Sequence, residues 1–284
     1  MELQKTKYKI AILDNGEIES LNRLKNQGIS VEMLMDSYDY ILIPEWVWQE
    51  VCDSEFRKTF IEEVQEKGYP VHVISEKKYN KLVSAELTLI EVFGKVIHPY
   101  AQLVRKYKKD ILKGQAASEI EYLYEEWIEK IYSDWPSDGD IITRKSGEQR
   151  QRKKNAGEIS IVFLAILLMI QENQDVEITI WSRDADCRFY MDEAMKRLQK
   201  DKRLSSRVSG TISYKPLEVV IQQIRNSEMI DDIKLDDMID DIRIERNIKY
   251  LLKKDDNSCD VRIEMVTNEK FKELIKDKNM MLIW

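Results

Sequence analysis

The sequence predicts an α/β fold: a central, mostly parallel sheet of four or five strands flanked by helices, with a helical insertion and an appended C-terminal module. Short apolar runs alternate with stretches of helical apolar spacing, which is the pattern of a parallel sheet covered on both faces. The runs end at turn residues such as Asp14-Asn15-Gly16 and Pro44. The longest apolar run, residues 159–170, is shorter than the roughly 20 residues of a bilayer span, so it predicts a buried helix.

Each expected strand is a short apolar run closed by a turn signal. The expected strands are residues 8–13, 40–43, 71–74, 177–181 and 211–214. Helices are expected at residues 17–26, 45–66 (one or two helices), 158–171 and 186–199, and from about Pro216 onward. Residues 77–132 predict two or three helices broken near His98-Pro99 and Gly114, and residues 133–156 predict a polar loop.

The chain changes character near Ser227, which predicts a domain at residues 1–226, with the insertion at about 77–156, and an α+β module at 227–284. Paired aspartates between Asp231 and Asp241 lie on a helical pattern and lack the Gly and closing Glu of a calcium loop. The module then has a strand-like run at 261–266 and an apolar end. The apolar side of its helix predicts a surface for docking on the core, for a protein partner or for self-association.

Composition excludes several classes of protein. The three cysteines and two histidines are scattered, so neither a zinc site nor a disulfide framework is expected. The N-terminus lacks a signal peptide, which favours a cytoplasmic protein without a membrane span. The net charge of −7 does not point to nucleic acid, although binding depends on how the charge is distributed. No glycine-rich phosphate loop is present, which argues against a Rossmann-like binder of small molecules.

Four carboxylates from separate segments are expected at one edge of the sheet. Asp14 and Asp184 follow predicted strands, Glu158 opens the apolar helix, and Glu50 lies on the helix entered through Pro44. Like charges held this close repel one another, and a divalent cation with a preference for oxygen, Mg²⁺ or Mn²⁺, removes that penalty. Such a cation activates water and stabilises charge on a phosphate.

Four pieces in this order resemble the PIN-domain family of metal-dependent nucleases. They are the strand ending in Asp14, the stretch Ile43-Pro44-Glu45-Trp46-Val47-Trp48-Gln49-Glu50-Val51, the helix start Gly157-Glu158-Ile159-Ser160, and Ser182-Arg183-Asp184 after a strand. The resemblance covers roughly residues 8–75 and 155–225. Family members often have Ser or Thr where this chain has Asn15, and residues 77–156 form a longer insertion than compact members contain.

The resemblance implies a PIN-like nuclease domain in which Asp14, Glu50, Glu158 and Asp184 surround the metal. It also implies that Asp186 is an additional acid and that Ser182 positions a water or a phosphate. Each acid has a structural alternative: Asp14 can shape a turn or cap a helix, Glu50 can be a surface residue, and Glu158 can be favoured by the helix dipole. Asp184 can be a loop residue and Asp186 a helix cap.

A basic strip leads into Glu158 and is the second functional feature. Its members are Arg144, Lys145, Arg150, Arg152, Lys153 and Lys154, and only Glu148 lies among them. Together with Ser182 and Arg183, the strip is a candidate nucleic-acid interface that holds a phosphate backbone without reading sequence. The alternative is a solvated loop. Aromatic residues, Trp135 first among them, could stack on bases, although core packing is the commoner role.

These features together predict a Mg²⁺- or Mn²⁺-dependent nuclease. An endoribonuclease is favoured because the resembled family is rich in ribonucleases, and the same analogy suggests a toxin or defence-type role. The alternative is a non-catalytic PIN-like scaffold that binds nucleic acid or a protein partner. The complete acidic set favours the enzyme, because a degenerate scaffold is expected to have lost part of it.

Overall fold

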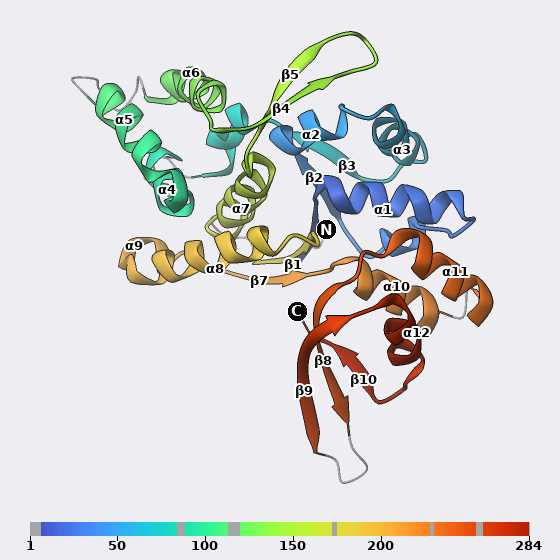
Figure 1. The fold of residues 1–284 in the computed structure, drawn as a ribbon. Coiled ribbons are helices and arrows are strands. Elements are labelled where there is room, and N and C mark those ends of the chain that lie inside the picture. The colour runs from blue at the N-terminus through green and yellow to red at the C-terminus, as the bar shows by residue number, and fades with distance from the viewer. Residues whose placement is uncertain are drawn as a thin grey trace, which may run out of the picture.

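The central sheet contains five strands that are all parallel, in the order β3-β2-β1-β6-β7 (Figure 1). The computed structural model describes residues 7–83, 89–112, 120–171, 175–227, 230–253 and 258–283. The strands are β1 (Lys7–Leu13), β2 (Tyr40–Pro44), β3 (Val71–Ile74), β6 (Asp175–Trp181) and β7 (Thr211–Tyr214). The predicted α/β class and parallel sheet are therefore confirmed.

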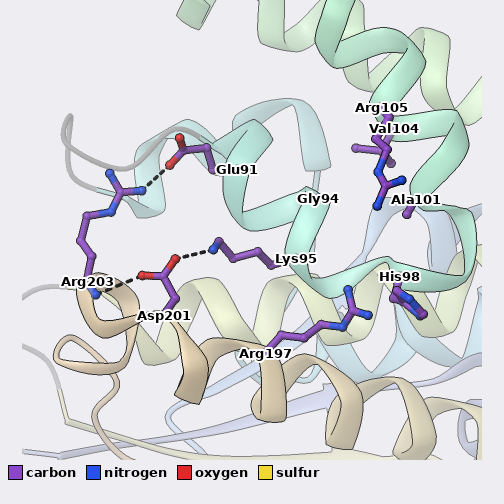
Figure 2. A pocket seen from close by; sticks show the side chains of 10 residues that line it. All are labelled: Glu91, Gly94, Lys95, His98, Ala101, Val104, Arg105, Arg197, Asp201 and Arg203. Carbon is purple, nitrogen blue, oxygen red and sulfur yellow. Dashed lines mark hydrogen bonds and ion pairs between the residues drawn. The ribbon is translucent and has the colours of Figure 1, made fainter.

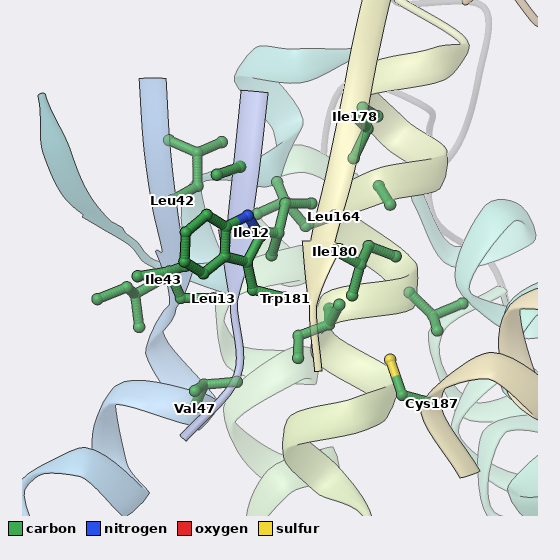
Figure 3. Packing of buried hydrophobic residues seen from close by; sticks show 14 of the residues in the cluster. Ile12, Leu13, Leu42, Ile43, Val47, Leu164, Ile178, Ile180, Trp181 and Cys187 are labelled. Atoms are coloured by element: carbon green, nitrogen blue, oxygen red, sulfur yellow. The ribbon is translucent and has the colours of Figure 1, made fainter. Parts of the chain in front are cut away.

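Helices follow each central strand and cover the sheet. They include α1 (Asn15–Asn26), α2 (Glu45–Val51), α3 (Glu55–Glu66), α7 (Ala156–Met169), α8 (Ala185–Lys200), α9 (Lys202–Ser205) and α10 (Leu217–Asn226). A short 3-10 helix, η1 (Glu32–Leu34), precedes β2. Nearly every residue of α7 is buried, and this helix packs on β1, β2 and β6. Figure 3 shows Leu164 of α7 beside Ile12 and Ile180, which explains why helix and strands read as continuous apolar runs.

The insertion begins as helices and ends as a β-hairpin. Its helical elements are η2 (Glu76–Leu82), α4 (Leu89–Val96), η3 (His98–Tyr100), α5 (Ala101–Leu112) and α6 (Ile120–Ser133). The predicted break at His98-Pro99 is confirmed, whereas Gly114 lies outside the described residues. The predicted polar loop is wrong, because β4 (Ser137–Thr143) and β5 (Gln149–Lys153) pair there. Neither strand has a buried face, so neither shows the apolar alternation that signals a strand.

Trp135, which precedes the hairpin, is a core residue and not a stacking platform for bases. It is 2% exposed, and its ring lies 4.5 Å from that of Tyr100 and 5.5 Å from that of Trp46. Its Nε1 donates to the carbonyl of Lys154 at 2.8 Å. The ring therefore fixes the end of the hairpin against the start of α7.

The C-terminal module holds a three-stranded antiparallel sheet of order β10-β8-β9. Its elements are α11 (Asp232–Ile242), β8 (Arg246–Lys253), β9 (Cys259–Val266), α12 (Asn268–Lys276) and β10 (Met280–Leu282). Gln27, the residue that follows α1, donates to Asp241 on α11 at 2.6 Å, and the apolar side of α11 is buried, so this helix docks on the rest of the chain. Within the described ranges, no helix has both the length and the apolarity needed to cross a membrane.

Gly210, at the start of β7, provides a test of the sheet edge. Its φ is +89°, and a Cβ there would lie 2.0 Å from the carbonyl oxygen of Val176 in β6. We expect Gly210→Ala to lower the free energy of unfolding by about 3 kcal/mol or more, because both the backbone and the β6–β7 contact must shift. Gly68→Ala is the matched control, since its φ is +88° and nothing lies within 4 Å of its Cβ position.

The control should lose only about 1 kcal/mol, the strain of a left-handed backbone with a side chain. Urea denaturation of both variants measures the difference. Equal losses would show that Val176 does not restrict this position.

Candidate functional site

The two central strands bring Asp14 and Ser182 together. β1 and β6 pair in parallel with Leu13 opposite Trp181, so the next residue of each strand lies at the same edge of the sheet. The Asp14 N–H donates to the carbonyl of Trp181 at 2.9 Å, and Ser182 Oγ donates to Asp14 Oδ2 at 2.8 Å. Asp14 also caps α1 by accepting from the N–H of Asn15 at 2.7 Å. The carboxyl group, on a residue only 8% exposed, is held by strand pairing and a serine hydroxyl.

The segment after β6 continues this network to Asp184. Ser182 Oγ accepts from the N–H of Asp184 at 3.1 Å, and Asp184 Oδ1 accepts from the N–H of Asp186 at 2.8 Å. Asp184 is thus the N-cap of α8, and the alternative that Asp186 is the cap is wrong. Asp186 instead accepts from Asn155 Nδ2 at 3.3 Å. The remaining faces of Asp184 and Asp186 are exposed at the edge of the sheet.

Glu50 and Glu158 approach this edge from two helices in contact, α2 and α7. A Cβ on Gly157 would lie 3.2 Å from Glu50 Oε1 and 3.4 Å from a methyl group of Val47. A larger residue at this position would have to displace the Glu50 carboxylate, so the glycine leaves room for that group beside the start of α7. Glu158 follows in the first turn of α7, where the helix dipole also favours a carboxylate.

The electrostatics show that the four acids act on one another. Burial, and then the negative charges of Asp14 and Glu50, raise the pKa of Glu158 to about 8. Burial, and then the charge of Asp14, raise the pKa of Glu50 to about 7. Burial also raises the pKa of Asp14, against the hydrogen bond from Ser182, and Asp184 adds to the rise. The structure therefore brings Asp14, Glu50, Glu158 and Asp184 into one repulsive cluster, while Asp186 lies at its margin.

This acidic cluster offers only oxygen ligands. Mg²⁺ and Mn²⁺ prefer such donors, and a cation would offset both the burial and the mutual repulsion of the negative charges, so the chemistry of the donor set fits a hard divalent ion. No three acidic, His or Cys side chains in the described part of the chain are already arranged to hold a metal together. Binding would thus require the carboxylates to turn toward one another. The nearby Cys187 is fully buried, and burial raises the pKa of its thiol well above the ordinary value.

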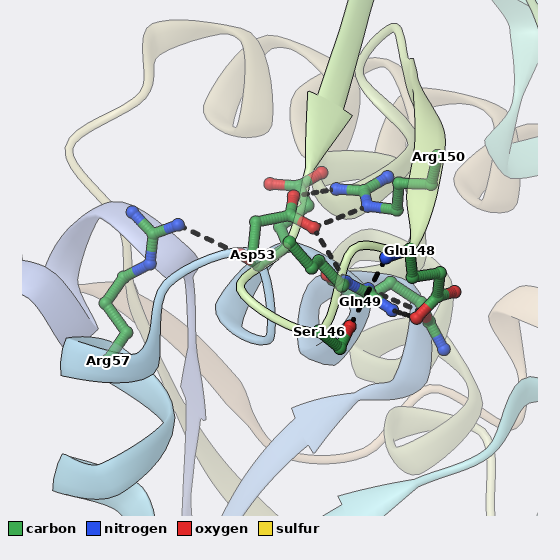
Figure 4. Close-up of polar contacts among 8 residues, drawn as sticks. Gln49, Asp53, Arg57, Ser146, Glu148 and Arg150 are labelled. Atoms are coloured by element: carbon green, nitrogen blue, oxygen red, sulfur yellow. Dashed lines mark hydrogen bonds and ion pairs between the residues drawn. The ribbon is translucent and has the colours of Figure 1, made fainter.

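The basic strip lies on the hairpin, and part of it is used to hold the hairpin in place. Arg150 forms a two-point ion pair with Asp53, which also pairs with Arg144 at 3.2 Å (Figure 4). Arg144 further donates to the carbonyl of Gln49 at 2.8 Å. These contacts fix the hairpin beside α2, close enough that Arg150 and Arg152 lower the pKa of Glu50.

The other cations of the strip are less constrained. Arg152 pairs with Asp138 at 3.2 Å, and Lys153 donates to the carbonyl of Ser133 at 2.6 Å. Lys145 and Lys154 are exposed and make no ion pair with the described residues. The strip thus divides into Arg144 and Arg150, which anchor the hairpin through Asp53, and the exposed Lys145 and Lys154, which make no ion pair with the described residues.

Two residues beside the site were missed at the sequence level. Glu17 is fully buried, burial raises its pKa to about 8, and its Oε1 accepts from the N–H of Leu217 at 3.2 Å. Its place three residues after the cap Asp14 is a capping-box signal that could have drawn attention to it. Arg246 donates to the carbonyl of Arg183 at 2.5 Å and pairs with Glu218. No local pattern marks this contact, which spans the two parts of the chain.

A cavity of about 430 Å³ that is lined by several cations lies between α4, α5 and α8, apart from the acidic cluster. Figure 2 shows that Lys95 pairs with Asp201 and Arg203 with Glu91, while Arg105 and Arg197 have no dashed contact. None of the site residues predicted from the sequence lines this cavity.

Comparison with known proteins identifies no relative that could assign a function to the site. A scan against protein families gives no match, and searches of curated proteins and of solved structures give none. The resemblance to PIN nucleases thus rests on the four ordered motifs of the sequence.

Replacing Glu158 with Gln tests the repulsion within the cluster. A carboxyl whose folded pKa is raised from 4.5 to about 8 binds its proton more tightly in the folded state, so stability falls as pH rises between those values. We expect Glu158→Gln to raise the Tm by about 3–6 °C near pH 8.5 in EDTA and to change it little near pH 5.

Circular dichroism during heating gives the measurement. Glu126→Gln, at an exposed position on α6, should leave the Tm unchanged at both pH values. A Tm near pH 8.5 equal to or below that of the parent protein would contradict a raised pKa of Glu158.

Proposed function

We propose that this chain is a Mg²⁺- or Mn²⁺-dependent nuclease with a PIN-like domain, and that RNA is its favoured substrate. The observation that carries the proposal is the convergence of Asp14, Glu50, Glu158 and Asp184 at one edge of the sheet, where burial and then the neighbouring negative charges raise the pKa values of Asp14, Glu50 and Glu158. The same residues in the same order carry the resemblance to PIN nucleases. The five-stranded parallel sheet supports the proposal, because ligands of such sheets bind beyond the carboxyl ends of the strands.

Within this proposal, Asp14, Glu158 and Asp184 hold the metal, and Asp186 adds negative charge at its margin. When bound, the cation polarises the scissile phosphate and makes water more acidic. Glu50, with a pKa of about 7, is suited to accept a proton through a carboxylate oxygen from the water that attacks phosphorus as the ester P–O bond breaks. Ser182 keeps Asp14 oriented through its 2.8 Å hydrogen bond.

The hairpin supports a polyanionic substrate. Lys145, Arg152 and Lys154 are exposed, and the half-buried Lys153 lies next to them at the entrance to α7. Contacts of this kind bind phosphates in any sequence and weaken with salt. Arg183 stands beside Asp14 and lowers its pKa, so it is placed to meet a phosphate at the acidic cluster. A toxin or defence-type role follows only by analogy with the resembled family.

The second candidate is a non-catalytic PIN-like scaffold that binds nucleic acid or protein. It is favoured by one observation: Asp14 and Asp184 both cap helices, so they have a structural use without any metal. A cap alone requires neither the burial of Asp14 nor the approach of Glu50 and Glu158. The enzyme explains more of the arrangement.

Substitution of Asp14 and Asp184 separates the two candidates. We expect Asp14→Asn and Asp184→Asn each to reduce Mn²⁺-dependent cleavage of a labelled RNA by at least about 100-fold, because each removes a charge that holds the cation. EDTA should abolish cleavage by the parent protein. Asp237→Asn, on the exposed side of α11, is the control and should cleave as the parent does.

Thermal unfolding of each variant shows whether it is folded, and the exposed position of Asp184 makes its variant the safer of the two. Full cleavage by both variants would overturn the assignment of these two carboxylates to the metal site, and absence of Mn²⁺-dependent cleavage by the parent protein would favour the scaffold.

A further inference from the structure

A cavity of about 520 Å³ lies between the acidic edge of the central sheet and the C-terminal module. One wall is formed by Arg188 and by residues 182–185, which include Asp184, and the other comes from β8, β9 and Ile283. Figure 1 shows the C-terminal sheet on the β7 side of the central sheet and the hairpin on the other side. The cavity and the acidic cluster therefore share Asp184.

The charges of this cavity are mostly positive. Arg183, Arg188, Arg246 and Lys249 line it, and Asp184 is the one acid among the described residues that do so. Arg246 is committed to Glu218 and to the carbonyl of Arg183. Arg188 and Lys249 make no ion pair within the described parts of the chain. Two uncompensated cations facing one space are suited to bind anionic groups.

The cavity also has an apolar wall, which a site that binds only phosphate groups would not require. In the β8–β9 ladder Lys249 lies opposite Ile263, so both stand on the same face of the C-terminal sheet. Ile263 is 70% exposed, and the ring of Tyr214 and the side chain of Ile283 complete this wall. Alternation of cationic and apolar side chains matches the phosphates and bases of an unpaired strand, whereas a duplex keeps its bases stacked inside.

We infer that this cavity is a binding groove for single-stranded nucleic acid, and that the C-terminal module supplies half of it. The inference rests on the proposed nuclease function and extends it to the path of the substrate. A strand would pass from the lysines of the hairpin, across the acidic cluster, to Arg188 and Lys249. Arg246 holds the two walls together by bridging Glu218 and the carbonyl of Arg183.

The test uses the full chain with Asp14→Asn, in EDTA, so that the strand is bound and not cut. A short fluorescein-labelled RNA is titrated by anisotropy, and the same sequence as single-stranded DNA and as an RNA duplex gives two further probes. The groove variant is Arg188→Gln with Lys249→Gln. The control is Arg105→Gln with Arg197→Gln, which changes the net charge equally in the separate cavity of Figure 2.

The groove variant should weaken binding of single-stranded RNA at least about 10-fold and lower the slope of log Kd against log salt by about 1.4, the loss of two phosphate contacts. Its affinity for the duplex should be unchanged, and the single-stranded DNA arm shows whether the groove distinguishes the sugar. The control should change the Kd by less than about 2-fold. Thermal unfolding verifies that each variant is folded.

Unchanged affinity in the groove variant, an equal loss in the control, or no RNA binding by the parent chain would each overturn the inference. Failure of the groove is distinguishable from failure of the proposed function. If the wild-type chain cleaves RNA while the groove variant binds RNA normally, the binding groove is rejected and the nuclease function is retained. If the groove variant loses RNA binding but the wild-type chain does not cleave RNA, the binding groove is retained and the nuclease function is rejected.

Discussion

The parallel pairing of β1 with β6 is the constraint on which the site depends. Leu13 opposite Trp181 fixes the register, and a shift of one residue would separate Asp14 from Ser182. The same register sets Asp14 beside Ser182, whose hydroxyl joins the Asp14 carboxyl to the N–H of Asp184. Packing of α7 across these strands then brings Glu158, and through Gly157 also Glu50, to the same edge. The hydrophobic core thereby determines where the acids meet.

Acidic charge at this edge is flanked by positive charge on both sides. The hairpin is held beside Glu50 by the ion pairs of Asp53, and the cavity beside Asp184 is lined by cations from both parts of the chain. Such an arrangement suits a polyanion that lies across the proposed metal site, because phosphates would meet cations at either end and carboxylates only in the middle. The net charge of −7 does not show this pattern, because it is the sum of the charges of all surfaces of the protein.

The sequence predicted those parts of the fold whose pattern is local. Strands and helices buried on both sides read as apolar runs, and Asp14 and Asp184 could be placed because they end such runs. The hairpin was missed because Arg144 and Arg150 hold it through Asp53, more than ninety residues away, and not through an apolar face. Arg246 was missed for the same reason, as it reaches Arg183 across 63 residues. Polar contacts between residues far apart in the chain produce no periodic pattern of apolar residues from which they could be predicted.

The most direct test of the acidic cluster is calorimetric titration of Mn²⁺ into the wild-type protein in buffers of different ionisation enthalpy. With pKa values of about 7 and about 8, Glu50 and Glu158 carry protons near neutral pH that a divalent cation must displace. Binding should release protons near pH 7 and release almost none near pH 9, with affinity rising between the two. Absence of Mn²⁺ binding, or binding with no proton release near pH 7, would contradict a metal site built from these carboxylates.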